Sequence, residues 1–285
     1  MKTLKTTFLL TALTLLLLLI GQAFGGRGGM TLALGFAILM NGGAYFFSDK
    51  IALMSSGAVP ISQEQSPRLY AVMERLAAKA NLPMPKLYMI PQPAPNAFAT
   101  GRNPSHASVA VTQGLMQLMD DEELEGVIAH ELSHVRNYDI LTSSIAATIA
   151  GAITWVASMG RWAMIFGGWG GRDNDREGGG GIAALLMLFL APLAALLLQL
   201  GISRQREYQA DASGAKMVGH PYGLIRALEK LGAYNNRIPM DIAPSTASLC
   251  IVAPLSARQI FSSLFSTHPP LADRIAVLRN MNVTR

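Results

Sequence analysis

The sequence is poor in charged residues, in aromatic residues and in cysteine. Only 14% of its 285 residues are charged while 51% are hydrophobic, which lies outside the usual composition of a soluble enzyme. Aromatic residues make up only 7%, so Leu, Ala and Met dominate the hydrophobic set. These are good helix formers, unlike the β-branched and aromatic mixture of a membrane barrel. We therefore expect a membrane protein whose lipid-embedded part is helical.

The single cysteine and the small net charge indicate which compartment the protein occupies and which partners it binds. Cys250 has no second cysteine with which to form an intramolecular disulfide, as is typical of a domain in a reducing compartment. The net charge is only +5, and no stripe of Arg and Lys interleaved with aromatic residues is present. We therefore exclude nucleic acid as a partner and expect the lipid bilayer instead.

The chain contains four apolar segments that are long enough to span a membrane. None of them contains a charged side chain in its interior, which favours true spans over buried core helices. Their approximate bounds are residues 7–24, 30–47, 140–160 and 182–202. The third is the least hydrophobic, being rich in Ala, Thr and Ser. Because Lys2 and Lys5 precede the first segment, a cleaved signal peptide is an alternative interpretation of it.

The distribution of basic residues predicts the orientation. If all these segments cross and both chain ends lie inside, the outer segments hold few basic residues, namely Arg27, Arg161, Arg172 and Arg176. We expect two N-terminal transmembrane helices in residues 1–48 and a transmembrane pair with a Gly-rich loop in residues 140–202. The polar blocks 49–139 and 203–285 then face the cytoplasm together and can fold as one domain. Within the first block, periodicity predicts a helix over residues 66–80 and strands over residues 86–90 and 106–112.

A His-Glu-x-x-His pattern lies at residues 130–134. Asp120 and the acidic residues after it predict a helix start, and an apolar stripe continues the helix. On a helix, His130 and His134 project from one face and can share a metal ion. Glu131 lies beside them, where it can take a proton from metal-bound water. The sequence therefore predicts a zinc site on this helix.

A catalytic zinc site needs a third protein ligand. Glu207 is our candidate, on a second expected helix that follows the fourth apolar segment. Asp211 lies one turn further on the same face, where it can accept a hydrogen bond from a ligating histidine. Three other histidines are rivals for the third position, namely His106, His220 and His268.

With these motifs in place, the chain resembles the HtpX-type membrane metalloproteases, relatives of the CAAX prenyl proteases. The resemblance covers essentially the whole length and rests on the motifs at residues 95–101, 130–134, 207–211 and 266–270, followed by Arg274. It implies a mainly α, multi-pass membrane protein with a cytoplasmic zincin-like α+β metalloprotease domain containing a small β-sheet. It also implies one zinc ion per chain with His130, His134 and Glu207 as its ligands. The activity that it implies is quality-control cleavage of misfolded membrane proteins in the inner membrane under stress.

The resemblance further implies an edge strand that pairs with an extended substrate backbone, formed by Asn96, Ala97, Phe98, Ala99 and Thr100. Peptide hydrolysis develops an oxyanion that needs a hydrogen-bond donor besides zinc, and His268 is our candidate for this donor. Arg274 would orient the carboxylate of Asp211 or Glu207. His268 before two prolines is equally typical of a helix start, and Arg274 of a surface residue.

Two other functions remain open at this stage. One is a processing protease for a dedicated substrate such as a prenylated tail. The other belongs to a different class, a helical membrane transporter or scaffold with a structural metal site. A transporter would carry polar groups inside its spans, whereas the polar chemistry of this chain lies outside them.

Overall fold

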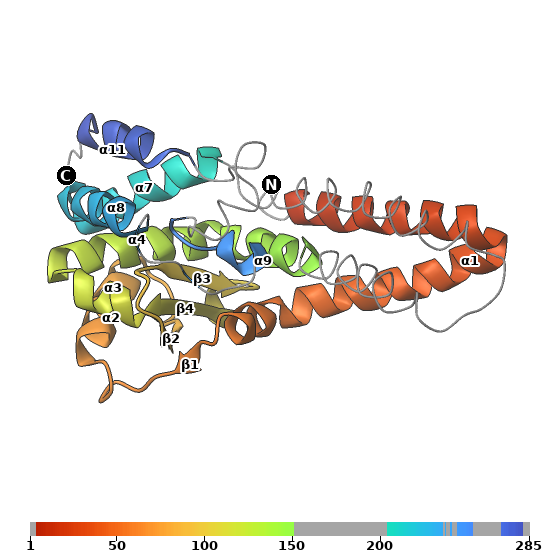
Figure 1. Cartoon of the computed structure of the whole chain (residues 1–285), viewed down its shortest axis with the longest axis horizontal. Helices are drawn as coiled ribbons and strands as arrows, with labels where there is room; N and C mark the ends of the chain where they lie inside the picture. The colour runs from red at the N-terminus through yellow and green to blue at the C-terminus, as the bar shows by residue number, and fades with distance from the viewer. Residues whose placement is uncertain are drawn as a thin grey trace, which may run out of the picture.

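A computed structural model describes residues 4–150, 204–235, 237, 240, 244–252 and 269–281 (Figure 1). Helices dominate the described part, and a four-stranded sheet lies beside them. The helices are α1 (Leu4–Ser55), α2 (Pro67–Lys79), α3 (Gln113–Leu118), α4 (Asp121–Asn137), α7 (Arg204–Val218), α8 (Tyr222–Asn235), α9 (Pro244–Ala247) and α11 (Leu271–Arg279). The strands are β1 (Val59–Pro60), β2 (Lys86–Ile90), β3 (Ala97–Gly101) and β4 (Ala107–Thr112).

Helix α1 is a hairpin of two arms that projects from the rest of the protein (Figure 1). Its turn lies at Gly26, whose φ of 56° is in the left-handed region that favours glycine. Between the arms, the Asn41 amide nitrogen donates to Thr14 Oγ1 at 2.8 Å. The outward surface of the second arm stays apolar, with Leu32 78% and Leu39 76% exposed. An apolar helix surface of this kind is stable in lipid rather than in water.

The arms of α1 coincide with the first two apolar segments expected from the sequence. Among the described residues, one helix, Gly25–Ser55, is long and apolar enough to cross a bilayer. The third expected segment begins as the shorter apolar helix Asp139–Ala150. The rest of that segment and the whole of the fourth, residues 182–202, lie outside the described residues. A multi-pass arrangement therefore stays a prediction.

The sheet has the strand order β1-β2-β4-β3, with β2 parallel to β4 and β3 antiparallel to it. The strand predicted over residues 86–90 is confirmed as β2. The strand predicted over residues 106–112 begins one residue later, because His106 ends a short 3-10 turn, η1 (Pro104–His106). Strand β3 is at the end of the sheet, so one of its edges faces away from β4.

Helix α4 is the central element of the domain. The predicted start is confirmed, because Asp120 accepts from the backbone N–H of Glu123 and the Glu123 side chain bonds back to Asp120. One side of α4 packs toward the sheet and the other toward α7 and α8 (Figure 1). Its apolar face is wholly buried, including Leu124, Val127, Ile128 and Leu132. Helices α7 and α8, which come from the second polar block, thus pack on a helix of the first.

Two glycines set how closely the neighbouring helices approach α4. A Cβ on Gly223 of α8 would lie 2.2 Å from the carbonyl oxygen of Glu122. A Cβ on Gly214 of α7 would lie 3.0 Å from the backbone nitrogen of His130. The backbone of α7 is therefore almost in contact with α4 at the first histidine of the His-Glu-x-x-His pattern.

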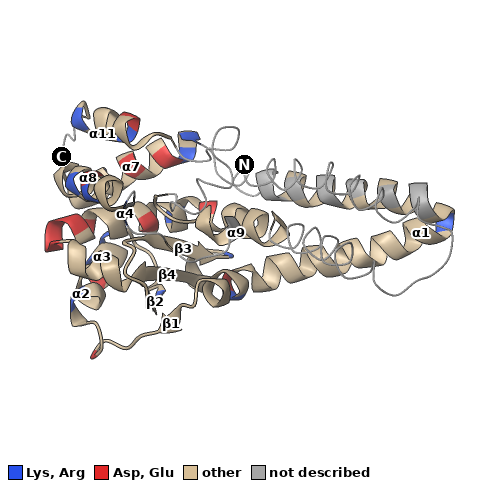
Figure 2. Cartoon of the chain, viewed as in Figure 1, with Lys and Arg blue, Asp and Glu red and all other residues tan. Residues whose placement is uncertain are grey.

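Charge is unevenly distributed along the molecule. Figure 2 shows Lys, Arg, Asp and Glu gathered on the domain, while the described part of α1 carries few of them. Among the described side chains of α1, the charged ones are Arg27 beside the hairpin turn and Asp49 and Lys50 near its base. This separation is what a helical hairpin in lipid and a domain in water require.

Candidate metal centre

Three side chains from two helices converge on one point. Residues His130 and His134 come from α4 and Glu207 from α7, and their ligand atoms all lie within 4.8 Å of one another. The two histidine Nε2 atoms are 3.3 Å apart, and Glu207 oxygens lie 3.7 Å and 3.5 Å from them. Tetrahedral zinc with bonds of about 2.0–2.1 Å to nitrogen holds two ligand atoms roughly 3.3 Å apart. The donor set and its spacing therefore fit a zinc ion.

Each histidine is oriented by a carboxylate on its other ring nitrogen. His130 Nδ1 lies 2.8 Å from Asp211 Oδ1, and His134 Nδ1 lies 3.3 Å from Asp139 Oδ2. Because a carboxylate accepts, both Nδ1 atoms carry the proton, and the Nε2 lone pairs are left for the metal. Asp139 follows Tyr138, whose φ of 63° ends α4 in the left-handed conformation. Asp139 was not among the residues predicted from the sequence, although its position between the His-Glu-x-x-His helix and an apolar segment was a signal for it.

The local electrostatics favour a cation at this point. Burial disfavours the protonated form of His134, but its hydrogen bond to Asp139 and the nearby Glu207 and Glu131 carboxylates outweigh burial and raise its pKa to about 9. Burial lowers the pKa of His130, which keeps that ring neutral as a metal ligand must be. The carboxylates around His134 thus stabilise a positive charge, whether a proton or a metal ion supplies it.

Glu131 lies beside the histidines and is almost fully buried. Its carboxylate accepts a hydrogen bond from the backbone N–H of Ala99 in β3. Burial is the largest influence and raises the pKa of Glu131 to about 7, although the nearby His134 opposes the rise. A carboxyl group with this pKa can both accept and release a proton near neutrality.

Arg274 of α11 connects the centre to the rest of the domain and is 0% exposed. Its Nε and Nη2 atoms donate to the two Asp211 oxygens at 2.8 Å and 2.7 Å. Burial disfavours the charged forms of both residues, but this paired contact lowers the pKa of Asp211 to about 2 and raises that of Arg274. Of the two carboxylates that the sequence offered for Arg274, the structure pairs it with Asp211, while Glu207 is 3.8 Å away.

Two of the three rival third ligands lie away from the centre. His106 bonds to Asn103, and His220 lies near Glu122 at the other end of α4. The third rival, His268, lies outside the described residues. The resemblance implied a strand over residues 96–100 that pairs with the substrate. The structure has a strand there, β3, preceded by Asn96, and Ala99 of this strand lies next to Glu131.

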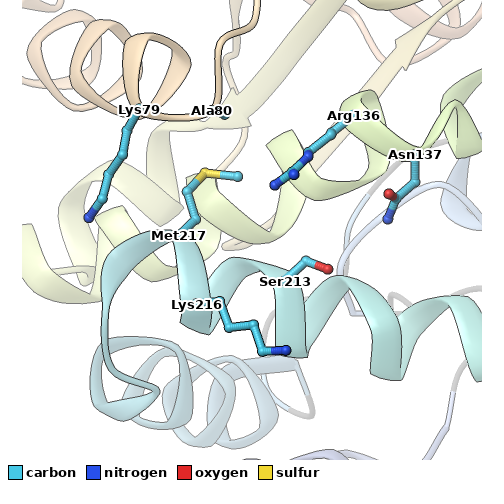
Figure 3. A pocket seen from close by; sticks show the side chains of 7 residues that line it. All are labelled: Lys79, Ala80, Arg136, Asn137, Ser213, Lys216 and Met217. Carbon is cyan, nitrogen blue, oxygen red and sulfur yellow. The ribbon is translucent and has the colours of Figure 1, made fainter. Parts of the chain in front are cut away.

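A hollow separate from this centre lies between the C-terminal ends of α2, α4 and α7 (Figure 3). Its volume is about 540 Å³, and Lys79, Arg136 and Lys216 line it without an acidic residue among the described lining. All three cations lie in the last turns of their helices, where the helix dipole stabilises positive charge. This hollow shares no residue with the metal centre.

The fold and the centre define a metallopeptidase of the His-Glu-x-x-His type, with its third ligand candidate on a separate helix. Comparison with known proteins agrees: the model of Peptidase family M48 matches residues 63–282. The chain belongs to this family and is of the HtpX type. It is therefore a membrane-associated metalloprotease, which excludes the transporter or scaffold.

The similar proteins span nearly the whole chain. A protein described as "Protease HtpX homolog" from Desulfatibacillum aliphaticivorans is 57% identical over 274 residues, which are 96% of this chain and 88% of that protein. Another of the same description, from Syntrophotalea carbinolica, is 52% identical over 284 residues, 99% of this chain and 100% of the relative. Among solved structures, Ste24p from S. mikatae superposes with a TM-score of 0.54 at 22% identity, covering 97% of this chain and 64% of that one. This last likeness shows the shared fold.

Proposed function

We propose that this protein is a zinc-dependent endopeptidase of the bacterial inner membrane, with His130, His134 and Glu207 as the protein ligands of one zinc ion per chain. The observation that carries the proposal is the convergence of these three side chains beside a buried carboxyl group, Glu131. When bound, zinc would act as a Lewis acid on the scissile carbonyl and lower the pKa of a water molecule.

The chain's own residues then perform the proton transfers. Glu131 acts as the general base that takes a proton from water and returns it to the leaving amine. The Ala99 N–H orients its carboxylate, and the pKa of about 7 suits both directions of transfer. Asp211 and Asp139 hold the two histidine rings in position, and Arg274 holds Asp211.

The polypeptide substrate binds along the outer edge of β3. An extended backbone there would pair with Asn96, Ala97, Phe98, Ala99 and Thr100, the segment that ends beside Glu131. His268, outside the described residues, is our candidate for a donor to the oxyanion. The substrates we propose are misfolded or damaged membrane proteins, because the hairpin α1 anchors the domain beside the bilayer.

In the same proposal the protease domain faces the cytoplasm. Residues 1–48 and 140–202 form the membrane part, and residues 49–139 and 203–285 form the two halves of the domain. The packing of α7 and α8 on α4 supports the joining of these halves.

The test is hydrolysis of casein by detergent-purified protein, measured together with bound zinc. Wild type should hold one zinc ion per chain and cleave casein, and a chelator should stop cleavage. Glu131→Gln should retain zinc and lose cleavage by at least about 100-fold, the usual scale of general base catalysis. Cleavage by the Gln variant at the wild-type rate would exclude Glu131 as the base.

A further inference from the structure

A short segment after α9 lies on the outer edge of β3, beside the metal centre (Figure 1). The backbone N–H of Ile251 donates to the carbonyl oxygen of Ala97 at 2.9 Å. The Asn96 side chain donates to the carbonyl oxygen of Val252 at 2.8 Å, and the Val252 N–H points back to the Asn96 amide oxygen at 3.5 Å. We refer to residues 250–252 as the strap.

The strap occupies the edge on which an extended peptide would pair. The Asn96 carbonyl oxygen accepts from the N–H of Thr112, so the backbone groups of Asn96 face β4. By alternation along the strand, those of Phe98 and Thr100 also face β4, and those of Ala97 and Ala99 point outward. The strap donates a hydrogen bond to the outward carbonyl oxygen of Ala97, and the Glu131 carboxylate accepts one from the outward N–H of Ala99. The strap is therefore next to the general base along the same edge.

The strap also reaches the groups that orient the metal ligands. Arg274 Nη1 donates to the carbonyl oxygen of Ile251 at 2.9 Å, while the same guanidinium holds Asp211. The preceding residue, Cys250, is 0% exposed, and its thiol lies close enough to Glu131 for that carboxylate to add to the rise of the thiol pKa that burial causes. A peptide backbone thus already lies between the edge of β3, Arg274 and Glu131.

Displacement of the strap by water would be costly, but displacement by another peptide would not. Water entry would break the bonds of the fully buried Arg274 and of Asn96, and unsatisfied buried polar groups are expensive. An incoming extended peptide carries the same N–H and C=O groups and can restore these bonds one for one. The side chains of Ile251 and Val252, 2% and 6% exposed, would leave apolar space that aliphatic side chains can refill.

We propose that the strap is an internal stand-in for the substrate, which must leave the β3 edge before cleavage and whose Ile251 and Val252 positions are refilled by two adjacent aliphatic residues of the substrate. The proposal rests on the proposed peptidase function and specifies its substrate class as hydrophobic extended segments. Such segments are what unfolded membrane proteins expose. The resting enzyme is accordingly latent until a suitable peptide exchanges with the strap.

Cys250 provides a native reporter, since it is the only cysteine of the chain. In zinc-loaded Glu131→Gln, which binds peptide without cutting it, we would measure the rate of Cys250 labelling by a maleimide, with and without saturating alkylated casein. Casein should raise the labelling rate by about tenfold or more, because it holds the strap in its released state. Unchanged or slower labelling, with casein shown to be bound by fluorescence anisotropy, would overturn the proposal.

Two variants on the wild-type background supply the second measurement. Ile251→Ala weakens the apolar anchor of the strap, so Cys250 labelling and kcat/KM for casein should both rise, by several-fold or more. Leu228→Ala in α8 is the matched control, because Leu228 is equally buried in the same core but lies on α8, not at β3. It should lower stability without raising kcat/KM. A lower kcat/KM for Ile251→Ala would show that the strap is a fixed wall of the site.

The cleavage sites in casein test the substrate class. Mass spectrometry of the products should show paired aliphatic residues enriched beside the cut bonds, and an absence of enrichment would refute that part. Failure of the proposed peptidase function can be distinguished from failure of the strap proposal, because in the first case wild type would leave casein intact and hold no zinc. If wild type cleaves casein and only the labelling or the enrichment fails, the strap proposal alone is wrong.

Discussion

At the scale of single residues, the centre combines groups that burial makes costly with partners that offset the cost. Asp211 and Arg274 form a nearly fully buried pair, with the carboxylate also bound to His130. Glu131 instead keeps its proton near neutrality, because burial outweighs the opposing effect of the nearby His134 and Arg274 on its pKa. These contrasting environments separate a supporting carboxylate from a proton-transferring one.

The first residue-scale prediction concerns the third ligand. Changing Glu207 to Ala should lower zinc affinity by more than the roughly 10–100-fold cost of losing a supporting carboxylate. The matched control is Glu229→Ala, because Glu229 is paired with Arg279 on the surface. Zinc content after dialysis against a graded chelator is the measurement. Full zinc retention by the Glu207 variant would remove Glu207 from the ligand set.

The second residue-scale prediction concerns the stability of the metal-free protein. Burial raises the folded-state pKa of Glu131 from 4.5 to about 7, so its favourable contribution is complete below about pH 4.5 and is lost as the pH rises through 7. At pH 8 the ionised, buried carboxylate costs roughly 3 kcal/mol. Metal-free Glu131→Gln should therefore have a higher Tm than wild type at pH 8 and a similar Tm at pH 4.5.

Thermal unfolding in chelator at the two pH values checks this second prediction. Glu229→Gln serves as control, since Glu229 is a partly exposed carboxylate in a surface pair. An equal Tm difference at both pH values would mean that packing, and not ionisation of Glu131, is the cause.

At the scale of elements, the close approach of α7 to α4 sets the geometry of the centre. Glu207, Asp211 and Gly214 lie on one face of α7, since they are separated by about one turn each. Gly214 lets this face approach the backbone of His130. The carboxylate of Glu207 thereby comes within 4.8 Å of both histidine ligand atoms.

We predict that Gly214→Ala lowers zinc affinity and stability, although alanine favours helix by about 1 kcal/mol over glycine. The added Cβ would lie 3.0 Å from the His130 nitrogen, and the neighbour is backbone that cannot turn away. Gly232→Ala in α8 is the matched control, because its Cβ meets only the flexible end of Leu271. Zinc titration and thermal unfolding check both variants, and a Gly214→Ala protein that binds zinc as tightly as wild type would contradict the argument.

At the scale of the whole molecule, an apolar hairpin and a charged domain meet at the base of α1. Asp49 and Lys50 lie there, within two turns of the end of the helix at Ser55. The first turn of the helix Asp139–Ala150 starts from the metal centre itself, since Asp139 is bonded to His134. The centre therefore lies next to the expected membrane surface, which is suited to substrates that emerge from lipid.

The orientation can be tested with fused reporters. A reporter active only in the cytoplasm should be active when fused after Arg285 and inactive when inserted between Arg172 and Gly178, because the distribution of basic residues predicts a cytoplasmic domain. Activity at both positions would mean that the third and fourth apolar segments form a hairpin that does not span.

The sequence by itself determined the elements whose signal is local. The acidic start and the four-residue spacing of His130 and His134 specify a helix with both rings on one face, and alternation specifies β4 to within one residue. Glu207 and Asp211 were predictable for the same reason, once the first helix required a third ligand. Helix period and metal chemistry act over a few residues, so no folded structure was needed to see them.

Only the tertiary structure decided which distant residues complete the centre. The left-handed conformation of Tyr138 turns Asp139 toward His134. Arg274 pairs with Asp211 rather than with Glu207, and the Ile251 N–H donates to the Ala97 carbonyl oxygen. Each contact depends on how α4, α7, α11 and β3 pack against one another. The energy of such packing comes from buried surface shared between remote segments, and no local pattern in the sequence records which partners will meet.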